Sequence, residues 1–121
     1  MPVYADPEGG VALRATDLYA WVAALVERLG TPRDIAADVA TVLVAADRRG
    51  IVSHGTARLP RYAIHVEQGT MDAAARPELL RERAAMAFFD AHNGWGHHAG
   101  RVATDAAITG ARAAGSFTAV V

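Results

Sequence analysis

Apolar side chains recur at helical spacing in two successive stretches of the first fifty residues. The first stretch places five of them on one helical face, namely Leu18, Trp21, Val22, Leu25 and Leu29. The second stretch places five more on one face, namely Ile35, Val39, Val42, Leu43 and Ala46. Glycine follows each stretch, at Gly30 and Gly50, and Thr16 and Thr31 precede them as expected N-caps. The pattern predicts two antiparallel helices joined by a short turn.

A third helix is expected over residues 56–68, but a proline complicates its start. Pro60 is tolerated only in the first turn of a helix, and it disfavours helical geometry at the residue before it. We therefore expect this helix to begin between Ser53 and Pro60 and to end before Gly69.

The pattern changes after residue 69 to short apolar runs. Residues 78–82 and 85–90 fit strands better than helices. Small residues recur on one side of a helix expected over residues 97–114, which would let that helix lie close to a sheet. A last apolar strand is expected over residues 117–121.

The predicted order is three helices followed by strand, strand, helix and strand. A helix between two strands is typical of a crossover connection, so the expected fold class is mixed α/β or α+β. Residues 1–15 are expected to be an irregular N-terminal segment, because prolines and glycines interrupt any period there. Residues 16–121 are then expected to belong to one domain, helical over residues 16–69 and α/β over residues 77–121.

Composition and charge narrow the class of protein. The chain has 121 residues, of which 52% are hydrophobic and 21% charged, and this balance is typical of a globular protein. Its net charge of −1 gives no electrostatic signal for nucleic acid or for an anionic membrane. There is no cysteine, no apolar run that could span a membrane and no secretory signal pattern at the N-terminus. We expect a cytoplasmic protein without nucleic-acid or membrane partners.

Four side chains of complementary chemistry fall within ten residues: Ser53, His54, Arg58 and Tyr62. The last three recur every four residues and would share one face if a helix began near Gly55. A guanidinium binds a carboxylate through two parallel hydrogen bonds, and a phenol can donate another. An imidazole moves a proton near neutral pH. The set can therefore bind a small carboxylate and transfer a proton beside it.

The same residues also have a purely structural interpretation. Ser53 could cap a helix, and His54 could be a partly exposed loop residue. Arg58 could pair with Glu67 or Asp47. The residues alone leave both interpretations open.

Two other patterns carry weaker signals. His92, His97 and His98 with Asp90 could suggest a metal site, but they lack an established ligand spacing, so no metal is expected. Metal-dependent hydrolysis through His54, His92 and Asp90 is a remote alternative. The Gly94-Trp95-Gly96 turn before a helix is similar to a phosphate-binding turn, but it lacks the full GxGxxG pattern.

The pattern ADxxGxxSHGxxRxxxY, which runs from Ala46 to Tyr62, resembles the malate/L-lactate/ureidoglycolate dehydrogenase family. These NAD(P)-dependent enzymes are distinct from the Rossmann-fold lactate and malate dehydrogenases. The resemblance continues through residues 87–90, the turn at residues 93–96 and the alanine-rich helix up to residue 115. It covers about residues 15–121, and its most specific part is the first pattern.

The resemblance implies reversible hydride transfer between NAD or NADP and a small 2-hydroxy or 2-oxo acid, or a related imino acid. It implies a catalytic role for His54 at the substrate pocket. Ser53 and Tyr62 match other family residues of that pocket, and Arg58 matches an arginine that binds the substrate carboxylate. Family members are dimers with pockets near subunit contacts, so a homodimer is expected.

The resemblance also implies that the chain carries only one side of the site. In the family, a strand like residues 117–121 leads into an Asn-His-x-Gly segment whose histidine is the expected acid/base. Most nicotinamide-binding residues lie further along, so no cofactor-binding residue is assigned here. We expect an N-terminal portion that is inactive alone and associates with the missing C-terminal portion. The alternative is a non-catalytic binding or interaction domain with the same fold.

Overall fold

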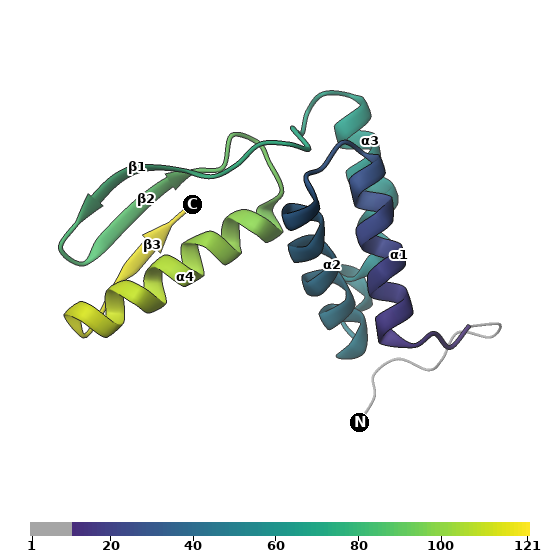
Figure 1. The fold of residues 1–121 in the computed structure, drawn as a ribbon, viewed down its shortest axis with the longest axis horizontal. Helices are drawn as coiled ribbons and strands as arrows, with labels where there is room; N and C mark the ends of the chain where they lie inside the picture. Colours follow the sequence, from purple (N-terminus) through teal and green to yellow (C-terminus); the bar gives the residue numbers. More distant parts are fainter. Residues whose placement is uncertain (1–10) are drawn as a thin grey trace.

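The computed structural model describes residues 11–121, which form a helical part and an α/β part lying side by side (Figure 1). The helical part contains α1 (Ala15–Arg28), α2 (Arg33–Arg48) and α3 (Leu59–Glu67). The α/β part contains β1 (Glu78–Arg83), β2 (Met86–Asp90), α4 (Gly96–Ala114) and β3 (Thr118–Val120). The predicted order and the mixed α/β class are confirmed. The irregular segment expected over residues 1–15 falls mostly outside the described residues, and residues 11–14 precede α1 without regular structure.

The first two helices run in opposite directions and pack against each other, as the apolar pattern predicts. Gly30 and Gly50 follow them with φ angles of 89° and 72°. L-residues with side chains rarely adopt this left-handed region, so both helices end where glycine permits the turn. Within the predicted stripes, Trp21 and Val42 are the exceptions, because 57% and 42% of their surfaces remain exposed.

Both predicted threonine caps are wrong, and each for a visible reason. Thr16 lies inside α1, whose N-cap is Arg14; the Arg14 guanidinium bonds the Asp17 carboxylate at 2.7 Å across the first turn. Thr31 is buried, and its hydroxyl accepts a hydrogen bond from the indole N–H of Trp95 at 2.9 Å. The Thr31 oxygen that the local sequence predicts to cap α2 is therefore bonded to a side chain 64 residues further along the chain.

The third helix begins at Leu59, inside the range predicted for it. Pro60 occupies its first turn, where a missing backbone N–H leaves no intrahelical bond unmade. Two single-turn 3₁₀ segments precede it, at Val52–His54 and Thr56–Arg58. The connection from α2 to α3 is therefore a tightly turned segment rather than an extended loop.

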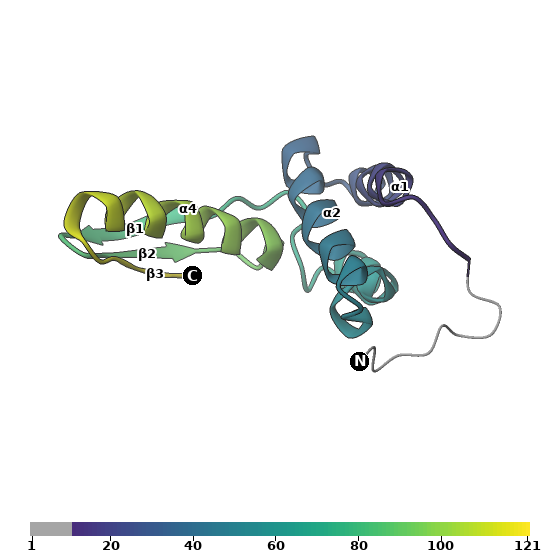
Figure 2. The ribbon, with the colours of Figure 1, turned by 90° about the horizontal axis from the view of Figure 1, so that it is seen from below.

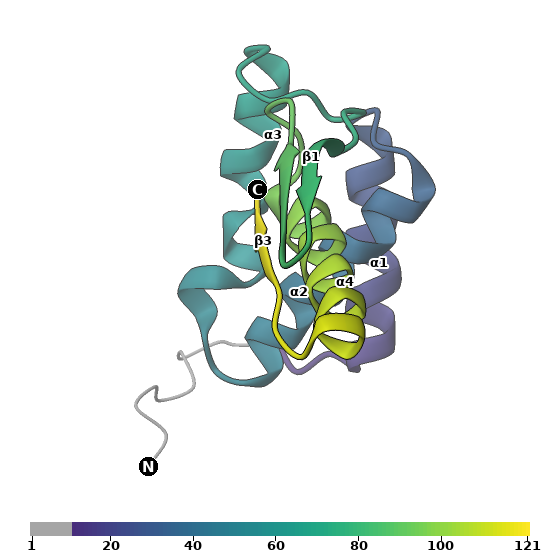
Figure 3. The same cartoon turned by 90° about the vertical axis from the view of Figure 1, so that its left-hand side faces the viewer.

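The three strands form one sheet in the order β1-β2-β3. β1 pairs antiparallel with β2, and β2 pairs parallel with β3. α4 makes the crossover between the two parallel strands and covers one face of the sheet, as Figure 2 shows. Figure 3 shows the strands side by side in front of the helical part.

The small residues predicted along α4 do allow close packing on the sheet. Ala99 and Ala103 are buried on α4, and Ala87 is buried on β2. At Gly110 an added Cβ would overlap the ring of Phe117, so only glycine fits there. α4 is 19 residues long, but within residues 11–121 no helix is apolar enough over sufficient length to cross a membrane.

One side chain from the α/β part completes the core of the helical part. Trp95 is 2% exposed and packs in the same cluster as buried side chains of α1, α2 and α3, including Val22, Val39 and Leu59. A tryptophan buries a large apolar area but needs a partner for its N–H, which Thr31 supplies. Trp95 also caps the start of α4, so its burial fixes that helix against the helical part.

Polar contacts of α2 carboxylates reinforce the same junction. The Asp38 carboxylate contacts His98 at 2.7 Å and Arg101 at 2.9 Å, both on α4. Asp34 pairs with Arg76 through two hydrogen bonds of 2.7 and 2.9 Å. The hydrogen bonds and charge of Arg76 lower the pKa of Asp34 to about 2. These contacts join α2 both to the segment before β1 and to α4.

Thr31→Val tests the tryptophan anchor with almost no change in side-chain volume. The substitution leaves the buried indole N–H of Trp95 without a partner, which should lower the free energy of unfolding by about 1–3 kcal/mol. Thr41→Val is the matched control, because the Thr41 hydroxyl is exposed and bonds only the carbonyl of Ala37 in its own helix. Chemical denaturation compares the two; equal stability losses would contradict the role given to Thr31.

Candidate functional site

The segment between α2 and α3 carries three of the four side chains singled out from the sequence. Ser53 and His54 lie in the first 3₁₀ turn, and Arg58 ends the second. Gly55, between the two turns, is buried in an extended conformation, and a Cβ there would overlap the carboxylate of Asp47. Absence of a side chain at this glycine lets α2 and the segment approach each other closely.

Ser53, His54 and Arg58 form one hydrogen-bonded group. The Ser53 hydroxyl lies 2.9 Å from Nδ1 of His54, with the direction of donation set by the imidazole tautomer. Nε of Arg58 donates to the backbone carbonyl of Ser53 at 2.6 Å. Ser53 and His54 are exposed and Arg58 is half-buried, so a small ligand can reach all three.

The guanidinium of Arg58 is held in place without being neutralised. Neither Glu67 nor Asp47 pairs with it, and within residues 11–121 no carboxylate lies within ion-pair distance of it. Its recorded hydrogen bond uses Nε, which leaves the two terminal nitrogens for a ligand. Those two nitrogens have the planar spacing that matches a carboxylate.

Tyr62 lies in α3 and makes different contacts. Its ring meets Trp95 at a centroid distance of 5.4 Å and His97 at 5.3 Å, both edge to face. The helical repeat expected to align it with His54 does not hold, because α3 begins at Leu59 and the preceding turns are separate 3₁₀ segments. The structure thus brings Ser53, His54 and Arg58 together and places Tyr62 against the α4 side of the molecule.

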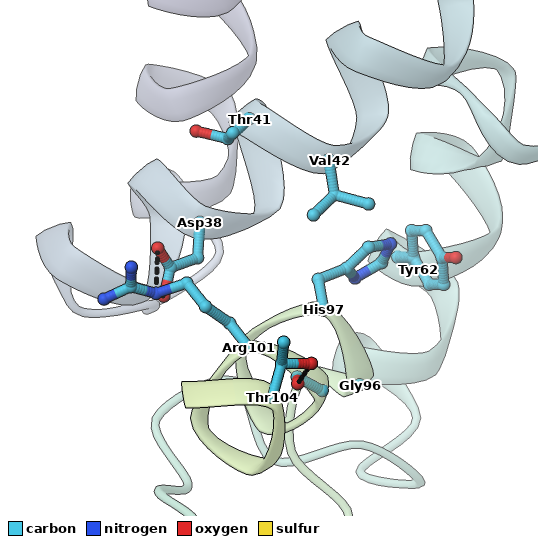
Figure 4. Close-up of a pocket in the computed structure, with 9 residues that line it drawn as sticks. Asp38, Thr41, Val42, Tyr62, Gly96, His97, Arg101 and Thr104 are labelled. Atoms are coloured by element: carbon cyan, nitrogen blue, oxygen red, sulfur yellow. Dashed lines mark hydrogen bonds and ion pairs between the residues drawn. The ribbon is translucent and has the colours of Figure 1, made fainter. Parts of the chain in front are cut away.

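A cleft of about 800 Å³ opens where α2, α3 and α4 meet (Figure 4). Its lining comprises Asp38, Thr41, Val42, Tyr62, Gly96, His97, Gly100, Arg101 and Thr104. Ser53, His54 and Arg58 are not among the lining residues. The ring of Tyr62 borders the cleft while its hydroxyl points away from His97, as Figure 4 shows.

Sequence reasoning missed this cleft, although a faint signal was present. Gly96, Gly100 and Thr104 recur every four residues on α4, and their small side chains leave space for the cleft on that side. On the opposite wall the Asp38 carboxylate contacts both His98 and Arg101, and the Arg101 guanidinium compensates the charge of that carboxylate. Nothing in the sequence alone indicates that α2 would lie across this face of α4.

His97 is the unusual titratable group of the cleft. Its Nδ1 is buried and has no hydrogen-bond partner among the described residues. Burial among Tyr62 and Trp95 lowers the pKa of the imidazole below its ordinary value, since a charged ring would lose its hydration. The neutral ring is therefore favoured in the folded protein.

The weaker sequence signals are not assembled into sites. Nε2 of His92 lies 3.0 Å from Glu78, and His98 is bound to Asp38. Over residues 11–121 no group of three or more potential ligands could hold a metal ion. The glycine turn before α4 is tightly packed at Gly94, where a Cβ would meet the carbonyl of Ala91 and the side chain of Ala75, whereas Gly96 is open and lines the cleft.

Known proteins resemble this chain over 64% to 93% of its length. A family model described as malate/L-lactate dehydrogenase matches residues 13–121. Malate dehydrogenase of Pyrococcus abyssi is 37% identical over 112 residues, which cover 93% of this chain and 31% of that protein. L-lactate dehydrogenase of Cupriavidus necator is 36% identical over 77 residues, which cover 64% of this chain and 22% of that protein.

Solved structures agree with the sequence matches. Malate dehydrogenase from Pyrococcus horikoshii OT3 superposes with a TM-score of 0.87 at 29% identity, over 93% of this chain and 32% of that chain. Sulfolactate dehydrogenase from Methanocaldococcus jannaschii superposes with a TM-score of 0.81 at 27% identity, over 84% of this chain and 30% of that chain. The matched region covers less than a third of the full length of each of these four relatives.

The buried imidazole of His97 makes a pH-dependent prediction. Because its pKa is lowered on folding, its contribution to the free energy of unfolding is complete above pH ~6.5 and is lost as pH falls through the folded pKa. NMR titration of the ring proton should give a midpoint below that of the unfolded chain in denaturant. A midpoint equal to or above the unfolded one would show that burial does not control this residue.

Proposed function

The chain belongs to the malate/L-lactate dehydrogenase family, and we propose that it supplies the substrate side of an NAD(P)-dependent oxidoreductase acting on a small 2-hydroxy or 2-oxo acid. The relatives that support this proposal are named as malate, L-lactate and L-sulfolactate dehydrogenases. Such acids share a carboxylate next to the carbon that is oxidised or reduced. A site for them needs one group to bind the carboxylate and another to handle a proton at the neighbouring oxygen.

The observation that carries the proposal is the unneutralised guanidinium of Arg58. Its Nε–H is fixed on the carbonyl of Ser53, so rotation of the side chain is restricted before any ligand arrives. The terminal nitrogens then accept a carboxylate as a pair of charge-assisted hydrogen bonds. An arginine already paired with Asp47 or Glu67 would have had to break an ion pair first.

His54 is the proposed proton-handling residue on this side of the site. Its Nδ1 is engaged with the Ser53 hydroxyl, which sets the ring orientation and leaves Nε2 for the ligand. An imidazole at this position can donate to a 2-oxo oxygen or accept the proton of a 2-hydroxyl group. Ser53 serves as the orienting partner of the ring. Tyr62 remains a proposed substrate-pocket residue, although its ring borders the cleft between α2, α3 and α4.

The nicotinamide cofactor would supply the hydride acceptor or donor for this chemistry. Among residues 11–121 the turn before α4 lacks the full GxGxxG pattern and its Trp95 side chain is buried in the core, so no dinucleotide-binding residue is assigned to this chain. Cofactor residues are therefore proposed to come from the remaining part of a longer family protein or from a second copy in a homodimer. The choice between NAD and NADP depends on those residues. The proposed location of the protein is the cytoplasm.

The 121-residue chain alone should not oxidise NADH or NADPH in the presence of pyruvate or oxaloacetate. The reason is that it holds a carboxylate-binding group without a site for the cofactor. Absorbance at the nicotinamide band measures the reaction directly. Steady turnover by the purified chain would contradict this prediction and the division of the site on which it depends.

Arg58→Ala should weaken substrate binding in a chimeric enzyme, in which residues 13–121 replace the matching segment of Pyrococcus abyssi malate dehydrogenase. Loss of one charge-assisted carboxylate contact costs on the order of 1.5–3 kcal/mol, so kcat/KM for oxaloacetate should fall roughly 10- to 150-fold. Most of the loss should lie in KM.

Arg61→Ala is the matched control for that experiment. Arg61 is an exposed arginine of α3, three residues further along, and it pairs with no carboxylate of residues 11–121. Its replacement removes the same charge from the same region while leaving the Ser53 contact intact. If both variants keep the parent KM and kcat, Arg58 has no place in the substrate site.

A further inference from the structure

We propose that Asp47 is the positioning residue of this candidate site: its carboxylate closes the loop that carries Ser53 and His54 and sets that loop relative to Arg58. The inference rests on the proposed function for its consequence in catalysis. Its structural part depends only on contacts within this chain. Asp47 itself touches no ligand in this account and acts through the residues it holds.

The carboxylate of Asp47 holds the far end of the loop by two hydrogen bonds. Oδ2 accepts one from the backbone N–H of Thr56 at 3.0 Å and another from the Thr56 hydroxyl at 2.7 Å. The backbone carbonyl of the same aspartate accepts from Gly50 N–H at 2.9 Å. One residue at the end of α2 therefore fastens both the start and the finish of the segment that contains His54.

Gly55 shows that this closure is built into the sequence. It is buried, and the space that its side chain would occupy is filled by the Asp47 carboxylate. Any larger residue would push the carboxylate away from Thr56. The glycine and the aspartate, eight residues apart in the sequence, are thus complementary in shape.

The position of Asp47 in α2 is otherwise unfavourable. It lies in the last turn of the helix, where the helix dipole disfavours a negative charge. Arg48 and Arg49 follow it and suit that end of the helix. A carboxylate at this place is accounted for by the bonds it makes to Thr56 rather than by helix stability.

The effect of the closure passes to the site through the second 3₁₀ turn. Thr56 begins that turn and Arg58 ends it, with Arg58 N–H bonded to the carbonyl of Gly55 at 3.1 Å. Nε of Arg58 then bonds the carbonyl of Ser53, which precedes His54. Without the aspartate, Gly55 becomes a free hinge and the guanidinium and imidazole lose their fixed separation.

Apolar neighbours strengthen this arrangement. Asp47 and Thr56 line a groove whose other walls include Trp21, Leu25 and Leu59. Hydrogen bonds to a carboxylate are stronger where apolar side chains reduce the local dielectric. The same surroundings make an unpartnered Thr56 N–H unfavourable, so the loop should change conformation when the carboxylate is removed.

Amide hydrogen exchange of Thr56, measured by NMR on the 121-residue chain, tests the structural part. Asp47→Ala should speed exchange of the Thr56 amide about tenfold or more, while Asp47→Asn should restore most of the protection because its carbonyl oxygen still accepts. Thr56→Val, which removes only the hydroxyl donor, should give an intermediate effect. The ¹⁵N shifts of the His54 ring should move in the same order.

Asp38→Ala is the matched control for exchange, because it removes another α2 carboxylate that holds a distant element, α4. Equal exchange of the Thr56 amide in Asp47→Ala and Asp38→Ala would overturn the inference, and so would an asparagine variant no better than alanine. Should Asp47→Ala fail to fold, the ranking of Asp47→Asn and Thr56→Val against the parent chain still decides the question.

The chimeric enzyme tests the catalytic part. Asp47→Ala should raise KM for oxaloacetate about tenfold, and Asp47→Asn should return KM to within about threefold of the parent. A purely structural loss would lower the amount of active enzyme and leave KM unchanged, which would overturn the positioning role. If the parent chimeric enzyme is inactive but the Thr56 amide is protected by Asp47, the proposed function fails and the closure of the loop stands.

Discussion

Burial of Trp95 is the constraint on which the arrangement of this molecule depends. The indole comes from the start of α4, fills the core formed by α1, α2 and α3, and bonds the buried hydroxyl of Thr31. Because Trp95 precedes α4 directly, its position determines where that helix and the sheet beneath it lie. Tyr62 and His97 pack on the same indole, so the cleft between the two parts depends on this one side chain.

The candidate site depends on a second, more local constraint. Asp47 reaches across to Thr56 through the space left by Gly55, and the segment between them presents Ser53 and His54. Arg58 closes the group by bonding the Ser53 carbonyl, while its terminal nitrogens remain free of carboxylates within residues 11–121. Family membership and this unneutralised cation together support binding of an organic acid. The match to less than a third of the relatives' length explains why we divide the proposed site between this chain and another polypeptide segment.

Features governed by local chemistry could be predicted from the sequence. Glycine after each apolar stretch marked the ends of α1 and α2, and Pro60 confined the start of α3 to a few residues. The succession strand, strand, helix and strand along the chain followed from the change of period and the small residues of α4. Residues 53, 54 and 58 were singled out because their chemistry is complementary within a short span, and the structure joins them by hydrogen bonds.

Features governed by distant contacts could not be predicted. Thr31 fits an N-cap locally, yet its hydroxyl serves an indole 64 residues away. Val42 fits the apolar stripe of α2, but the cleft against α4 leaves it exposed. Tyr62 fits a four-residue repeat with His54, which fails because two 3₁₀ turns replace the helix over that span. In each case the local sequence does not indicate which distant segment of the chain packs against the residue.

The most direct test of the central claim is a crystal structure of the chimeric enzyme with oxamate, an unreactive analogue of a 2-oxo acid. We expect the oxamate carboxylate to lie on the two terminal nitrogens of Arg58 at ~2.7–2.9 Å, with the ring of His54 beside the oxo group. Oxamate bound instead in the cleft by His97 and Arg101, with Arg58 in contact only with solvent, would contradict the account.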